Sequence, residues 1–87
     1  MNPLLTTLEI ISALSGADAT AAQLQTQFDL SIATLKRHIA EARHLGAKIE
    51  SVKLGKVSTY TLRNGQEVTA RLDRWLELER SRDLTKP

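Results

Sequence analysis

Apolar residues recur near the N-terminus at the spacing of a helix. Four of them, at intervals of four, three and three residues, fall on one helical face: Leu4, Leu8, Ile11 and Leu14. Asn2 is a favourable N-cap and Pro3 a favourable first helical residue. Gly16 is a candidate left-handed cap at the other end. These signals predict a helix over residues 3–15, followed by a short link over 17–19 that is either extended or irregular.

Two further helices follow, separated by a tight turn. Thr20 and Gln23 fit a capping box, which opens a helix ending near residue 28. Its inward residues are expected to be Ala21, Leu24 and Phe28. Leu30 lies in the turn, where we expect it to fill the gap between the two helices. Ser31 caps the second helix, which Gly46 ends, and whose buried stripe is predicted to be Leu35, Ile39 and Ala42.

The pattern then changes from helical spacing to alternation. Residues 47–52 alternate, with Ala47, Ile49 and less clearly Ser51 on one side. Gly55 supplies the positive φ of a turn at 53–56, and the β-branched run 57–62 forms the return strand. The spacing of apolar residues over 66–82 predicts a last helix. Its apolar face carries Val68, Leu72, Trp75 and Leu76, with Leu78 at the edge.

This order predicts one domain over residues 1–87, mainly α with a small β-hairpin. Helices at 3–15 and 20–45 would form a three-helix core, the hairpin at 47–62 a two-stranded wing, and 66–82 an additional helix. That arrangement is a winged helix-turn-helix.

The composition limits the kinds of core and binding site that the chain can form. Apolar residues make up 41% of the chain but aromatics only 3%, so the core must be aliphatic. The chain has no Cys, which excludes disulfides and Cys-based zinc sites. His38 and His44 are not at a metal-binding spacing on a helix. We therefore expect no metal or cofactor and, since no signal peptide or membrane span is recognisable, a soluble cytoplasmic protein.

The charge is unevenly distributed. The formal net charge is only +2, yet residues 1–30 sum to −3, residues 31–63 to +5 and residues 64–87 to 0. The excess falls on the predicted second helix of the helix-turn-helix and on the hairpin. This is the charge pattern of a surface that faces phosphates, although a window of this length can also reach such a sum by chance.

Residues 20–62 resemble the winged helix-turn-helix domains of deoxyribose-operon-repressor (DeoR)-type bacterial regulators and of the biotin operon repressor. The matching positions are Thr20, Leu24, Leu30-Ser31, Thr34, Leu35, Lys36-Arg37 and Leu45-Gly46. His38 stands where many such regulators have Asp, and Ile32 where they often have a basic residue. The resemblance implies DNA binding and transcription regulation. Because only a short segment follows the hairpin, we expect a stand-alone module of the kind found in small plasmid- or phage-type regulators.

A helical wheel selects the candidate DNA-contacting residues. With Leu35 facing inward, Ala33, Thr34 and Arg37 are candidates for base edges, and Lys36 for a base or a phosphate. The other candidates are Ser31 at the helix start and the hairpin lysines Lys53 and Lys56, all on phosphates.

Each candidate has a simpler role as well. Ser31 can be only an N-cap, Arg37 can pair with Glu41, and the lysines can be solvated side chains. Arg43 is expected at the flank or on the DNA backbone.

A module of this size that reads one half-site would have low specificity, so we expect a homodimer on a palindromic operator. The candidate dimer residues are Trp75, Leu76 and Leu78, although Trp75 can equally anchor the last helix to the core.

The sequence supports three classes of function to different degrees. The leading prediction is a sequence-specific double-stranded DNA-binding protein, a small repressor or regulator. The alternative is a winged-helix protein-interaction module, which the apolar Ile32 and Leu54 favour, or a DNA-binding accessory factor of replication, partition or excision. A regulatory protein partner is compatible with each of these functions. An enzyme is not expected, because no phosphate-binding Gly loop or catalytic triad is recognisable.

Overall fold

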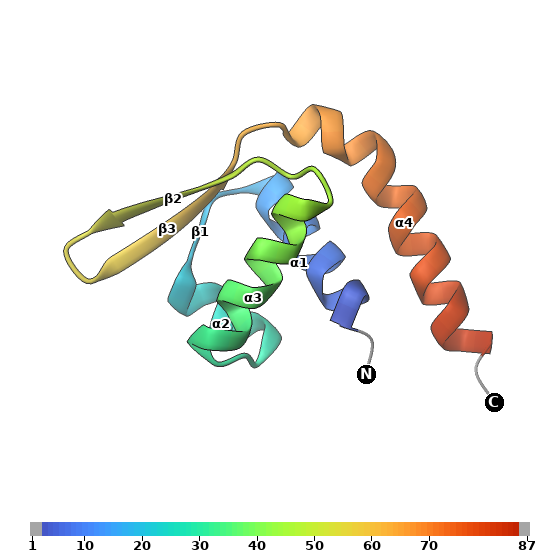
Figure 1. Cartoon of the computed structure of the whole chain (residues 1–87), viewed down its shortest axis with the longest axis horizontal. Coiled ribbons are helices and arrows are strands. Elements are labelled where there is room, and N and C mark those ends of the chain that lie inside the picture. Colours follow the sequence, from blue (N-terminus) through green and yellow to red (C-terminus); the bar gives the residue numbers. More distant parts are fainter. Residues whose placement is uncertain (1–2, 86–87) are drawn as a thin grey trace.

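The computed structural model describes residues 3–85, with side chains described up to Ser81. The protein is mainly helical with a small antiparallel sheet, as the sequence predicts (Figure 1). The elements in chain order are α1 (Pro3–Gly16), β1 (Ala19–Thr20), α2 (Ala21–Phe28), α3 (Ile32–His44), β2 (Ile49–Leu54), β3 (Val57–Leu62) and α4 (Gly65–Thr85). No helix in the described part of the chain is long and apolar enough to cross a membrane.

The two central helices begin at the predicted caps. The Thr20 hydroxyl accepts a hydrogen bond from the Gln23 amide, and the Gln23 side chain accepts one from the Thr20 amide, which completes the capping box. Asp29, with a φ of 53°, closes α2 in the left-handed conformation. The predicted left-handed cap at Gly16 is wrong, because Gly16 has no positive φ and α1 includes it. Asn2, the predicted cap of α1, lies outside the described residues.

The sheet has three strands instead of the predicted two, in the order β1-β3-β2. Ala19 pairs with Tyr60 and Thr20 with Thr59, so the short link before α2 becomes an edge strand. This pairing joins residues far apart in the sequence, and local pattern could not reveal it. Gly55, at a φ of 62°, makes the tight turn of the hairpin, whose outer part projects away from the helices (Figure 1).

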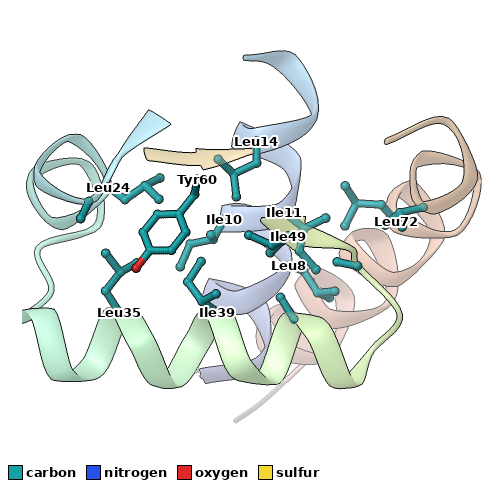
Figure 2. Close-up of a cluster of buried hydrophobic side chains, with 14 of the residues drawn as sticks. Leu8, Ile10, Ile11, Leu14, Leu24, Leu35, Ile39, Ile49, Tyr60 and Leu72 are labelled. Carbon is teal, nitrogen blue, oxygen red and sulfur yellow. The ribbon is translucent and has the colours of Figure 1, made fainter. Parts of the chain in front are cut away.

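One core, which is aliphatic except for Tyr60, joins the helices and the sheet (Figure 2). The predicted stripe of α3, which is Leu35, Ile39 and Ala42, is fully buried. Helix α1 departs from its predicted stripe. Ile10 and Thr7 are buried as well, whereas Leu4 is only partly buried, because α1 is covered on one side by α3 and on another by α4. A helix covered on two sides buries more than one stripe.

The alternation of buried and exposed residues that is predicted for the first hairpin strand ends after Ile49. Ala47 and Ile49 are buried, but Ser51 is exposed. Ser51 lies on the edge strand β2, whereas its partner Tyr60 lies on the central strand β3 and is buried.

Candidate nucleic-acid interface

Helix α3 presents a polar and basic surface opposite its buried stripe. Ser31 caps it: the Ser31 hydroxyl accepts a hydrogen bond from the Thr34 amide at 3.2 Å and donates one to the Thr34 hydroxyl at 3.0 Å. Ala33, Lys36 and Arg37 are exposed, and Thr34 is partly buried. The first turns of the helix therefore offer an open face with two cations.

A groove brings some of the predicted residues together. It lies between α2, α3 and the hairpin, has a volume of about 450 Å³, and is lined by three lysines among other residues: Lys36, Lys53 and Lys56. The hairpin lysines come from a segment 17 or more residues beyond Lys36, so the fold creates this cluster of like charge. A groove lined by three ammonium groups suits an anionic partner.

Arg37 lies apart from that groove. It borders a separate depression of about 410 Å³ between α1 and α3, together with His38 and Glu41. Among the described side chains, Arg37 and Glu41 do not form the ion pair that we considered from the sequence. The salt bridge found there joins Arg63 to Glu50. Arg37 is thus exposed and available to a ligand.

His38 fixes the position of α3 on α1. Its Nδ1 lies 2.8 Å from the Thr7 hydroxyl, which donates to the Pro3 carbonyl. The imidazole tautomer decides whether Nδ1 or the Thr7 hydroxyl is the donor in this hydrogen bond. Burial lowers the pKa of His38, the charge of Arg37 lowers it further, and Glu41 opposes both. The neutral ring therefore joins the two helices.

The cations near the base of the hairpin have structural partners. Arg43, which we expected at the flank or on the DNA backbone, donates from Nε to the Ile49 carbonyl and so ties α3 to β2. Arg63 donates two hydrogen bonds to the Glu50 carboxylate across the strands. The pair lowers the pKa of Glu50 and raises that of Arg63 through the hydrogen bonds and the charges.

Asn64, which lies between β3 and α4, has a structural role. Its Oδ1 accepts from the Lys48 amide, and its Nδ2 donates to the Gly46 carbonyl and to the Glu67 carboxylate. It therefore joins the end of α3, the start of β2 and the start of α4. Gln25 was missed in the sequence: it lines the lysine groove and donates to the Leu30 carbonyl. No local signal marked Gln25, because its position depends on how α2 packs.

The three candidate dimer residues have different environments. Leu76 is 6% exposed and belongs to the core, so it offers little surface to a second copy of the chain. Trp75 is partly buried against the core, and Leu78 is 56% exposed. Together with Leu4 and Leu45 they line a small apolar pocket of about 140 Å³.

The outer half of the hairpin carries an exposed apolar stripe. Leu54 pairs with Val57 across the strands and Val52 is two residues before Leu54, so all three share one face of the hairpin. Their exposed fractions are 75% for Leu54, 51% for Val57 and 41% for Val52. On α3, Ile32 is also 43% exposed. The sequence indicated Ile32 and Leu54, but not that two valines continue the patch.

Comparison with protein-family models gives no match, and comparison with curated proteins gives no significant match. Within the described residues, no three His, Asp or Glu side chains gather into a group that could hold a metal ion.

Proposed function

We propose that the protein is a winged helix-turn-helix module that binds double-stranded DNA by sequence and regulates transcription, most simply as a repressor that occludes a promoter. The observation that carries this proposal is the groove in which Lys36 of α3 and the hairpin lysines Lys53 and Lys56 come together. The element order α1-β1-α2-α3-β2-β3 and the sheet order β1-β3-β2 also agree with a winged helix.

In this proposal α3 enters the major groove by its N-terminal half. Arg37 donates a bidentate pair of hydrogen bonds to a guanine, and Ala33 and Thr34 meet neighbouring base edges. Ser31 lies at the helix start, where amide groups and the helix dipole favour a phosphate. The lysines of the groove neutralise phosphates, which contributes affinity without sequence preference.

A homodimer would give the proposed regulator a longer recognition site. The support for it is the apolar surface that Trp75 and Leu78 form with Leu4 on α1. Leu76 is not part of this surface, since it is needed in the core of each subunit. A two-fold arrangement through these residues would place two copies of α3 on two half-sites of a palindrome.

The test is a selection from a pool of random duplexes with the purified protein at about physiological salt, followed by sequencing of the bound fraction. We expect one enriched inverted repeat, with an affinity that falls steeply as salt rises. A protein that enriches no sequence and binds without salt dependence would refute the proposal.

Substitutions then separate the two kinds of contact. Arg37→Ala should cost about 1–3 kcal/mol and relax the choice at one base, whereas Lys56→Ala should weaken all sequences alike and reduce the salt slope by about one. Arg80→Ala is the matched control, because Arg80 is an exposed cation on α4 away from the groove. Equal effects of all three changes would show that only net charge matters.

A second function is favoured by one specific observation, the exposed apolar stripe of the hairpin. In that case the module binds another protein through the hairpin and through Ile32 on α3. The same selection distinguishes the two functions, because a protein-interaction module would enrich no duplex. An accessory role in replication, partition or excision would retain DNA binding and differ in the genomic site that the selected sequence matches.

A further inference from the structure

The tip of the hairpin combines an exposed leucine with positive charge, which the proposed phosphate contacts alone do not explain. Leu54 is 75% exposed, the highest value among the large apolar side chains of the described residues. Lys53 precedes it, and Lys56 lies in the turn that follows. A solvated hairpin tip would not need a large apolar side chain between two lysines.

The hairpin holds Leu54 in a defined place. Leu54 and Val57 are opposite each other and enclose the two-residue turn of Gly55 and Lys56. Gly55 has a φ of 62°, and Lys56 is not among the residues with positive φ, which is the pattern of a type II′ turn. Paired strands of six residues extend about 20 Å, so the tip lies at the outer end of a regular ribbon (Figure 1).

The chemistry of the tip favours one partner. The segment 51–66 contains no acidic residue, and Lys53 and Lys56 are the cations beside Leu54 in the sequence. A DNA minor groove has the complementary arrangement, with phosphates along both rims and apolar sugar edges and base steps inside. Apolar side chains that enter this groove separate neighbouring bases and kink the duplex.

We infer that Leu54 acts as an apolar wedge, entering a base step from the minor groove and bending the DNA bound by α3. Val57 follows it as a second apolar contact, and Lys53 and Lys56 hold the two flanking phosphate rims. The inference depends on the proposed DNA binding. It adds that the site is read partly through deformability, with a flexible pyrimidine–purine step favoured where the hairpin tip lies.

The experiment measures bending separately from binding. The most enriched duplex of the selection, about 30 base pairs long, carries a donor dye at one end and an acceptor at the other. Energy transfer is recorded at saturating protein, so that a loss of affinity does not alter the reading. A 2-aminopurine placed in turn at each step reports unstacking.

We expect the wild-type protein to raise energy transfer and to increase 2-aminopurine fluorescence several-fold at one step. Leu54→Ala should abolish both signals while weakening binding by less than about tenfold, and Leu54→Met should retain them. Because Leu54 is exposed, neither change should prevent folding. Gln66→Ala, at an exposed position on α4 outside the groove and the apolar surfaces, is the control and should bend DNA as the wild type does.

The other outcomes overturn the inference in distinguishable ways. A wild-type complex with a straight, fully stacked duplex refutes the wedge and leaves the proposed function intact. Bending that survives Leu54→Ala shows that another part of the protein deforms the DNA. If the wild-type protein enriches no duplex, the wedge and the proposed function both fail, and the apolar stripe then belongs to a protein-binding surface.

Discussion

Ser31 is expected to serve both the stability of α3 and the contact with DNA, and two substitutions separate these roles. In the folded protein its hydroxyl accepts from the Thr34 amide, which would otherwise have no partner within the helix. Ser31→Ala removes this acceptor. Ser31→Asp retains an acceptor and adds a negative charge that suits a helix N-terminus but repels a phosphate.

The magnitudes follow from this geometry. Loss of an N-cap side chain costs about 1 kcal/mol, within a range of roughly 0.5–2 kcal/mol. For a domain of this size, that lowers the melting temperature by about 4–8 °C. The aspartate should leave the melting temperature unchanged or slightly raised. It should weaken DNA binding about fivefold or more, because one added charge beside a phosphate costs at least about 1 kcal/mol.

Thermal unfolding followed by circular dichroism gives the first quantity, and fluorescence anisotropy with the selected duplex gives the second. Thr20→Ala is the matched control for stability, since Thr20 caps α2 with the same type of hydrogen bond. If Ser31→Ala melts with the wild type while Thr20→Ala melts several degrees lower, the capping role of Ser31 is refuted. If Ser31→Asp binds DNA as the wild type does, no phosphate lies at the start of α3.

Three further predictions concern the support of the interface. Asn64→Ala should lower the free energy of unfolding, measured by urea titration, by about 1–2 kcal/mol, because the Lys48 amide and the Gly46 carbonyl lose their partner. An unchanged free energy would show that water replaces the side chain. Leu35→Ala, at a fully buried position, should lower the free energy of unfolding by about 2–5 kcal/mol. Ile32→Ala, at an exposed position, should lower it far less. Equal losses of stability would contradict the packing of α3. The lowered pKa of His38 means that the unfolded chain binds the proton more readily, so this stability contribution is complete above about pH 6.5 and declines as the pH falls toward the folded pKa. His38→Gln should flatten that part of the pH–stability curve, and an unaltered curve would exclude His38 as its source.

Local signals predicted most of the secondary structure because each signal lies within a few residues. The capping box at Thr20, the N-cap at Ser31 and the positive φ at Gly55 are all present in the fold. The buried stripe of α3 follows from spacing alone, since a helix must bury the side on which its apolar residues gather. For the same reason, the exposed face with Arg37 could be selected on a helical wheel.

Contacts between distant segments were not predictable in the same way. The third strand exists because Ala19 and Thr20 meet β3, and Arg43 is bound to the Ile49 carbonyl because α3 ends beside β2. Leu76 and Trp75 are neighbours in one apolar pattern, yet only the packing of α4 on α1 decides that Leu76 is buried and Trp75 partly open.

In the candidate interface, too, some features follow from local sequence and others from the packing of distant segments. The sequence by itself determined the helices, their caps, the hairpin turn and the positive charge of residues 31–63, because these depend on residue type and short spacing. Only the tertiary structure decided that Lys36 shares a groove with the hairpin lysines, that Arg37 lies outside it, and that the apolar stripe continues beyond Leu54. The physical reason is that such neighbours are set by how separate elements pack on a common core, which no single segment encodes.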